Sequence, residues 1–244
     1  MEVQTVEKLI QMNIKAMAHS YREDIENSAL SNYTVSEYLA RITDLEWDHR
    51  QNRKISNLKK AASFRQQAHP LQIDYKSDRS LDNQVMQRIL RLDFIKRAEN
   101  IIITGLTGTG KSYLAQAIGV QACEMLYKTL YYPMSIFSDT VLTMNIQGTY
   151  IKWMKGLKNV PLLILDDFGL TNFTSETRKA LMEIVDYKYG RSAVIFASQI
   201  PVKKWHELLG ESTIADAIMD RIVHNSHRIK LTGESMRRKN KLKS

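Results

Sequence analysis

Three glycines, a lysine and a serine stand together after 104 residues that contain no glycine at all. They form the stretch "GLTGTGKS", with Gly105, Gly108, Gly110, Lys111 and Ser112 in the spacing G-x-x-x-x-G-K-[ST]. This pattern is typical of a loop whose backbone N–H groups surround phosphate oxygens, with the lysine at the β- and γ-phosphates and the hydroxyl on Mg²⁺. The alternative is a glycine-rich turn with an incidental lysine. The residues predicted to bind the phosphates are Gly105, Leu106, Thr107, Gly108, Thr109, Gly110, Lys111, Ser112 and Tyr113.

Two adjacent carboxylates end an apolar run, "LLILDD", at Asp166 and Asp167. A magnesium ion beside a triphosphate needs a carboxylate close by. We expect Asp166 to face the metal together with Ser112, and Asp167 to orient the attacking water. Two neighbouring carboxylates at a strand end would repel each other without a cation, which disfavours a purely structural role.

Further polar residues could meet the γ-phosphate. The apolar run "VIFASQ" ends in Gln199, whose amide could hold the attacking water. Arg221 and Arg237 follow, and an arginine at the γ-phosphate accelerates phosphoryl transfer by about 10³–10⁵. The alternative for each arginine is a solvated surface charge, and spacing alone does not place either one at the nucleotide.

Short apolar runs alternate with amphipathic stretches from residue 100 onward. This alternation predicts an α/β fold, with a five-stranded parallel sheet covered by helices on both faces. The expected strands are 100–104, 129–132, 161–167, 192–198 and 228–231. The P-loop pattern requires a strand before it and a helix after it, and both are predicted.

The first part of the chain reads as helical. Thr34 and Glu37 have the spacing of a capping box, and we expect Leu39, Ile42 and Leu45 on the buried side of the helix that follows. Pro70 marks a boundary. We therefore expect a small all-helical domain over 1–69 and an ATPase-type domain over 70–244 that ends in a basic tail.

The formal net charge of the chain is +9, which favours a polyanionic partner such as nucleic acid over the alternative of a merely basic protein. From His49 to Ile73 the chain has six Lys or Arg and no acid. We expect this run to contact DNA or a protein partner. A solvated helix face is the alternative, especially for the lysines near residue 155. The candidate DNA-contacting residues are Arg50, Arg53, Lys54, Lys59, Lys60, Lys152 and Lys155.

Cys123 is the only cysteine, which excludes an internal disulfide and fits a reducing compartment. No apolar run approaches the ~20 residues of a membrane span, and charges occupy the start of the chain where a signal peptide would be apolar. These features predict a cytoplasmic protein with no membrane partner.

Three stretches together resemble the IstB-like ATPases, which are AAA+ helper proteins of insertion-sequence transposition related to the DnaC helicase loader. They are "GLTGTGKS", "LLILDDFG" and "ASQIPVKKWHELLGESTIADAIMDRIVHNSHRIKLTGESMR". The resemblance covers most of residues 70–238. The last stretch is more discriminating than the P-loop, which many unrelated families share.

The resemblance implies an AAA+ core in which the strand ending at Gln199 lies between the two phosphate-site strands. It implies that Gln199 is sensor I, that Arg221 is an arginine finger acting on ATP held by a neighbouring subunit, and that Arg237 is sensor II. The cofactors would be ATP and Mg²⁺. The protein would be an ATPase, stimulated by DNA, that forms a homo-oligomeric ring, spiral or filament on duplex DNA and recruits or regulates a transposase.

Two residues depart from the family pattern. Asp167 stands where many AAA+ proteins have glutamate, and because its side chain is shorter we expect slow hydrolysis. Gln199 stands where many have asparagine, and neither change argues against ATP binding. Two other functions stay open: a DnaC-like loader of a replicative helicase, and a small-molecule kinase. The kinase would need an acceptor pocket, for which the sequence offers no candidate. An adjacent transposase gene or replication gene would distinguish the first two.

Overall fold

The protein is described here from a computed structural model, which covers residues 2–76, 79–210 and 212–236. Packing divides the chain into two compact units, Met1–Asn57 and Leu58–Ser244. The expected domain boundary after residue 69 stays a prediction. Within the described ranges, no helix combines the length and the apolar character needed to cross a membrane.

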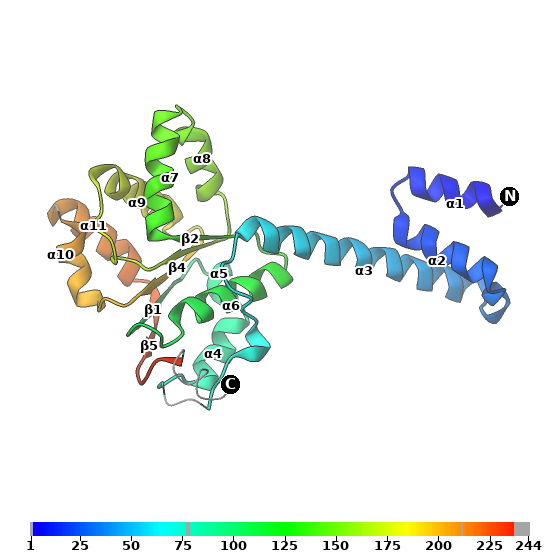
Figure 1. Ribbon diagram of the computed structural model, residues 1–244, viewed down its shortest axis with the longest axis horizontal. Coiled ribbons are helices and arrows are strands. Elements are labelled where there is room, and N and C mark those ends of the chain that lie inside the picture. Colours follow the sequence, from blue (N-terminus) through cyan, green and yellow to red (C-terminus); the bar gives the residue numbers. More distant parts are fainter. Residues whose placement is uncertain (1, 77–78, 211, 237–244) are drawn as a thin grey trace. The chain divides into compact units, whose positions relative to one another are not determined.

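The described elements follow one another as a helical segment and then an alternating α/β segment (Figure 1). The helices are α1 (Glu2–Gln11), α2 (Lys15–Glu26), α3 (Val35–Ala62), α4 (Asn83–Leu90), α5 (Asp93–Lys96), α6 (Lys111–Glu124), α7 (Met134–Ile146), α8 (Tyr150–Lys158), α9 (Ser175–Lys188), α10 (Trp205–Leu209) and α11 (Ser212–Val223). Short 3₁₀ turns are η1 (Ala29–Asn32), η2 (Pro70–Gln72) and η3 (Val202–Lys204). The strands are β1 (Asn100–Gly105), β2 (Thr129–Pro133), β3 (Leu162–Asp166), β4 (Ala193–Ser198) and β5 (Ser226–Leu231).

Helix α3 begins with the predicted capping box. The Thr34 hydroxyl accepts a hydrogen bond from the Glu37 amide, and the Glu37 carboxylate accepts one from the Thr34 amide. Ile42 is buried, but Leu39 and Leu45 are 59% and 40% exposed, so the expected burial of these two was wrong. Polar side chains of α3 contact α2 as well: the carboxylate of Glu46 accepts hydrogen bonds from the amides of Ala16 and Met17 at the start of α2.

The sheet has five parallel strands in the order β2-β3-β4-β1-β5, which confirms the predicted fold class. Strand β4 lies between β1 and β3, as the resemblance implied. The carboxyl ends of these three strands therefore meet at one edge of the sheet, where ligands bind in open α/β folds.

Alternate residues of β1, β2, β3 and β4 enter two separate hydrophobic clusters. Ile101 and Ile103 pack on one face with residues of α4 and α6, whereas Ile102 packs on the other face with residues of α7, α8, α9, α10 and α11. This period of two is what a strand buried on both sides requires. The helices that pack on the sheet in this way include α6, which begins at the P-loop.

Candidate nucleotide site

The P-loop connects β1 to α6, as its sequence predicted. Gly108 and Gly110 have φ of 85° and 96°, the left-handed region that glycine adopts readily. A Cβ on Gly110 would lie 2.6 Å from Nη1 of Arg79, and one on Gly108 would overlap the Ser235 side chain. These glycines thus permit close packing against other parts of the chain, and their expected role beside phosphate oxygens stays a prediction.

Lys111, the last residue before Ser112 in the P-loop pattern, is only 7% exposed. Its Nζ donates a hydrogen bond to the Leu106 carbonyl at 2.9 Å. The hydroxyl of Thr109 donates to the same carbonyl at 2.8 Å. These bonds hold the loop in its curved form, so that the start of α6, with its positive helix-dipole end, stays accessible to an anion.

A cavity of about 430 Å³ opens beside the P-loop at the start of α6. Its volume lies in the range of about 300–1,000 Å³ that is usual for small-molecule sites. The lining residues are Gln66, Gln72, Asp74, Arg79, Gly108, Gly110, Lys111, Ser112, Tyr113 and Met236. The cavity therefore joins the phosphate loop to the segment that precedes α4.

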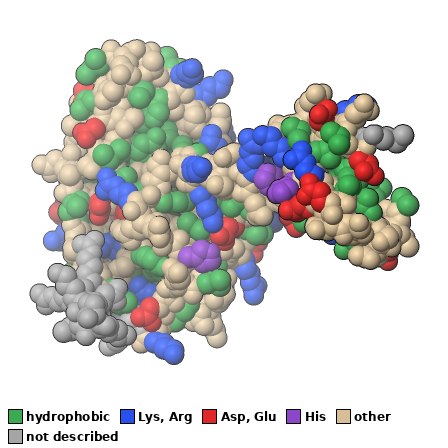
Figure 2. Space-filling model, turned by 45° about the vertical axis from the view of Figure 1, so that its right-hand side comes forward, with side chains coloured by type: hydrophobic (Ala, Val, Ile, Leu, Met, Phe, Trp, Pro, Cys, Tyr) green, Lys and Arg blue, Asp and Glu red, His purple; other side chains and the backbone are tan. Residues whose placement is uncertain are grey.

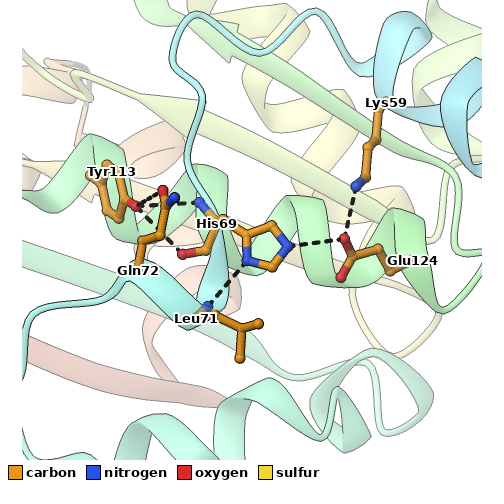
Figure 3. A network of polar contacts seen from close by, with 6 residues as sticks. All are labelled: Lys59, His69, Leu71, Gln72, Tyr113 and Glu124. Atoms are coloured by element: carbon orange, nitrogen blue, oxygen red, sulfur yellow. Dashed lines mark hydrogen bonds and ion pairs between the residues drawn. The ribbon is translucent and has the colours of Figure 1, made fainter.

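One wall of this cavity is fixed to α6 by hydrogen bonds. The Tyr113 hydroxyl lies between the amide and carbonyl of His69 and the side chain of Gln72, at 3.3–3.4 Å (Figure 3). The buried carboxamide of Gln116 accepts from the amides of Arg65 and Gln66 at 2.8 and 2.9 Å.

A second group of contacts fixes the same segment farther along α6. Glu124 accepts a hydrogen bond from Lys59 at 2.8 Å, and Nε2 of His69 lies 3.4 Å from the same carboxylate oxygen (Figure 3). Nδ1 of His69 in turn accepts from the Leu71 amide, at the start of η2. The segment from Lys59 to Gln72 thus follows α6 from its end back to the P-loop.

Asp166 is the last residue of β3 and is 1% exposed. Its two oxygens accept hydrogen bonds from the Tyr131 hydroxyl at 2.7 Å and from the Asp167 amide at 2.8 Å. Burial, together with the charge of Asp166, raises the pKa of Tyr131, so Tyr131 remains a donor. Asp167 has φ of 55°, which ends the strand directly after Asp166.

Gln199 follows β4 and contacts the P-loop directly. Its side-chain oxygen accepts a hydrogen bond of 2.5 Å from the Thr107 hydroxyl. Neighbouring Ser198 is fully buried and donates to the Phe168 carbonyl at 2.6 Å, which ties the end of β4 to the turn after Asp167. The structure therefore brings the predicted residues after β1, β3 and β4 to one edge of the sheet.

Arg221 does not join this group within one chain. It lies in α11, where its guanidinium forms an ion pair of 2.8 Å with Asp186 of α9. Its carbonyl accepts a hydrogen bond from the side chain of Asn100, the first residue of β1. The P-loop begins at the other end of this strand, and six residues span ~17 Å. Arg237 lies outside the described residues.

The candidate DNA-contacting residues have different surroundings. Arg53, Lys54, Lys60, Lys152 and Lys155 are exposed. Arg50 forms an ion pair with Glu46, whereas Lys59 is bound to Glu124 as described above. Figure 2 shows Lys and Arg side chains gathered beside His side chains on the surface of the first unit.

Sequence reasoning missed five residues that line the cavity: Met236, which follows β5, and Gln66, Gln72, Asp74 and Arg79, which precede the P-loop. The last four precede the P-loop by 26 residues or more, counted from Arg79 to Gly105. The only local signal was Pro70, which marked a boundary but gave no ligand. Their common position follows from the packing of this segment against α6.

Known proteins resemble the whole of this chain. The family model for IstB-like ATP binding proteins matches residues 7–244. An insertion sequence ATP-binding protein of Sinorhizobium fredii, y4pL, is 39% identical over 241 residues, which covers 98% of each chain.

Two solved structures share the fold. A DnaI structure aligns with a TM-score of 0.60 and 21% identity, over 68% of this chain and 92% of DnaI. The DnaC helicase loader aligns with a TM-score of 0.56 and 18% identity, over 67% of this chain and 96% of DnaC. The fold is therefore the AAA+ P-loop fold that the resemblance implied.

Proposed function

Because the chain belongs to the family of IstB-like ATP-binding proteins, we propose that it is an ATP-dependent helper of DNA transposition. The protein assembles as a homo-oligomer on duplex DNA, recruits or regulates a transposase in the cytoplasm, and uses ATP binding and hydrolysis to switch assembly on and off. One observation carries the ATPase part of this proposal. Lys111, Asp166 and Gln199 follow three adjacent strands at the same edge of the sheet.

The P-loop and the cavity support ATP as the ligand. A triphosphate at the start of α6 meets the helix N–H groups and the buried ammonium of Lys111. Its nucleoside then has the cavity of about 430 Å³ beside Tyr113 and Gln72. The basic charge of the site offsets the charge of the phosphates.

The residues present fit magnesium. Ser112 offers a hydroxyl and Asp166 a buried carboxylate, and Mg²⁺ prefers such oxygen ligands. Both carboxylate oxygens of Asp166 already accept one hydrogen bond, which leaves each a second lone pair. When bound, the ion would neutralise charge that develops on the β- and γ-phosphate oxygens.

Hydrolysis would use Asp167 and Gln199. Asp167 accepts a hydrogen bond from the attacking water and orients it toward the γ-phosphate. The Gln199 oxygen is occupied by Thr107, so its amide N–H groups are the part that can donate to the γ-phosphate or to the water. The short side chain of Asp167 favours slow turnover, which suits a switch better than a motor.

The position of Arg221 supports assembly. Its carbonyl contacts Asn100 at the start of β1, the end away from the P-loop, and its guanidinium pairs with Asp186, so we expect it to act on a triphosphate held by another copy. ATP would then favour the assembled state by its higher affinity for that state. Loss of the γ-phosphate removes the bridging charge, and the assembly loosens.

The decisive experiment compares wild type with Lys111→Ala by electron microscopy and analytical ultracentrifugation. Each protein is mixed with duplex DNA, Mg²⁺ and a non-hydrolysable ATP analogue, and each component is omitted in turn. Wild type and the control Lys96→Ala should assemble only with DNA and nucleotide together, whereas Lys111→Ala should not assemble. A wild-type protein that stays monomeric when saturated with nucleotide beside DNA would contradict the proposal.

The second candidate function is loading of a replicative helicase, which the structural similarity to the DnaC helicase loader favours. The two functions differ in the protein partner. Affinity purification distinguishes the two functions. The nucleotide-bound assembly is tested for binding to a transposase encoded next to this gene and to the host replicative helicase, since each function requires one partner and excludes the other.

A further inference from the structure

Arg79 is a buried cation in the wall of the nucleotide cavity. Its side chain is 3% exposed, and it precedes α4 in a segment that sequence motifs did not single out. Burying a guanidinium is unfavourable, and this burial lowers the pKa of Arg79 from its ordinary value, against the opposing charge of Asp74. A buried cation next to a phosphate loop calls for a specific physical explanation.

The guanidinium is held from two sides. Nη1 donates to the Thr109 carbonyl of the P-loop at 3.3 Å, and Nη2 donates to the Asp74 carbonyl at 2.6 Å. The lack of a side chain on Gly110 makes room for Nη1. The main chain is fixed as well, because the Arg79 carbonyl accepts from the Thr232 amide after β5.

The Nε–H group, the third donor site of the Arg79 guanidinium, has no such contact. Nε of Arg79 is buried and has no hydrogen-bond partner among the described residues. Leaving a buried donor without an acceptor costs more free energy than a typical hydrogen bond contributes to stability. Native structures therefore rarely contain such a donor without a functional or structural reason. Arg79 lines the cavity, so a ligand acceptor to which a small shift of this side chain exposes Nε would satisfy it.

The position of the cavity identifies the part of the ligand that Arg79 would meet. The lining includes Arg79, Tyr113 and Gln72 but not Asp166, Gln199 or Thr107, which lie at the γ-phosphate end of the proposed site. A triphosphate with its γ-phosphate at that end has its nucleoside in the cavity.

We propose that Arg79 is a nucleoside-binding residue, whose Nε–H donates a hydrogen bond to an acceptor atom of the base or ribose. This inference rests on the proposed ATP site and assigns one of its residues. The two Nη contacts orient the guanidinium before the ligand arrives, so that little side-chain entropy is lost on binding. Lysine at this position would keep the charge but lose the fixed fork.

The test uses calorimetric titration of the full chain with ATP and with inorganic tripolyphosphate, both with Mg²⁺. We expect Arg79→Lys to weaken ATP binding about tenfold, the effect of one hydrogen bond to a charged group, and to change tripolyphosphate binding less than about twofold. The matched control is Arg88→Lys, an exposed arginine of α4, which should change neither affinity.

Each outcome has a distinct meaning. A wild type that binds neither ligand overturns the proposed function itself. If wild type binds ATP and Arg79→Lys binds it equally well, only the inference about Arg79 is overturned. An equal loss of affinity for ATP and for tripolyphosphate also overturns it, because Arg79 would then act on the loop or on the phosphates. Should the variant fail to fold, the wild type decides: ATP must bind at least about tenfold tighter than tripolyphosphate, and equal affinities overturn the inference.

Discussion

The hydroxyl of Thr107 donates a 2.5 Å hydrogen bond to the side-chain oxygen of Gln199. The bond joins the P-loop, after β1, to the residue that follows β4. It fixes which end of the amide can act as a donor toward a phosphate or a water. We therefore expect the contact to link phosphate binding to hydrolysis.

Gln199→Ala should lower the rate of ATP hydrolysis about 10²-fold, as the loss of one donor to a developing negative charge does. Affinity for a non-hydrolysable ATP analogue should change less than about twofold, because Lys111 and the loop amides remain. Thr107→Val should have a smaller effect in the same direction. Steady-state phosphate release is measured for wild type, Gln199→Ala and Thr107→Val. The control variant is Gln87→Ala, because Gln87 is an exposed residue of α4. Normal hydrolysis by Gln199→Ala would contradict this role.

Arg221→Ala should abolish assembly on DNA and the hydrolysis that depends on it, but leave ATP binding by the single chain intact. A mixture of Arg221→Ala and Lys111→Ala, each inactive alone, should recover hydrolysis, because one chain supplies the P-loop and the other the arginine. Malachite-green assays of the two proteins and their mixture measure this. A mixture that stays inactive would argue against an arginine supplied by a neighbouring copy.

Asp186 is the control for that experiment. Its ion pair with Arg221 is partly exposed, and such pairs contribute about 0–1 kcal/mol to stability. Asp186→Asn should therefore leave the free energy of unfolding within about 1 kcal/mol of wild type and should not weaken assembly. A strong loss of assembly would mean that the pair holds α11 in its working position.

Tyr131→Phe removes a buried hydrogen bond to the carboxylate of Asp166. A hydrogen bond to a charged group contributes about 1.5–3 kcal/mol, so the variant should be less stable by roughly that amount. Hydrolysis should also need more Mg²⁺, because Asp166 is less well oriented. Urea unfolding and Mg²⁺ titrations measure the two effects, with Tyr132→Phe as the neighbouring control. If stability and Mg²⁺ dependence are both unchanged, Tyr131 does not help to orient Asp166.

Lys188 gives a pH dependence of stability. Burial lowers its pKa from 10.5 to about 8, although its Nζ contacts the Val160 carbonyl and the Ser192 hydroxyl. Between these two pKa values the unfolded chain holds the proton and the folded chain does not, so stability rises with pH. The free energy of unfolding of wild type relative to Lys188→Met should rise by about 1–3 kcal/mol from pH 8 to 10.5. A flat difference would show that Lys188 stays charged.

The basic face of α3 is tested by salt dependence. Arg53 and Lys54 are both exposed, and removing one side chain that neutralises a DNA phosphate should reduce the slope of log affinity against log salt by about 0.9. Arg53→Gln with Lys54→Gln should thus lower both duplex DNA affinity and the slope, whereas Lys96→Gln should not. Fluorescence anisotropy at several salt concentrations measures this, and an unchanged slope would place the DNA elsewhere.

The sequence was most informative where the signal is local. The strands and the P-loop were predicted correctly because apolar runs, turn residues and glycine spacing lie within a few residues of one another. The order of the strands is a non-local property. It followed from the resemblance to a family, and the structure confirms it at β4.

Non-local packing explains what the sequence did not predict. Arg79 and Gln72 line the cavity because a segment far from the P-loop packs on α6. The helical periodicity at the start of the chain does not indicate the break at Asn13, whose φ is 62°. Leu39 and Leu45 have helical spacing, yet polar side chains take the contact that would have buried them.

Helix α6 carries Lys111 of the P-loop at its start and Glu124, which holds Lys59, at its end. A helix of 14 residues is a stiff rod of ~21 Å. We expect a small tilt of this rod around a triphosphate to move Lys59 and the last turn of α3 with it. A change of one phosphate at the first turn of α6 would then be felt at Lys59, beside the last turn of the same helix.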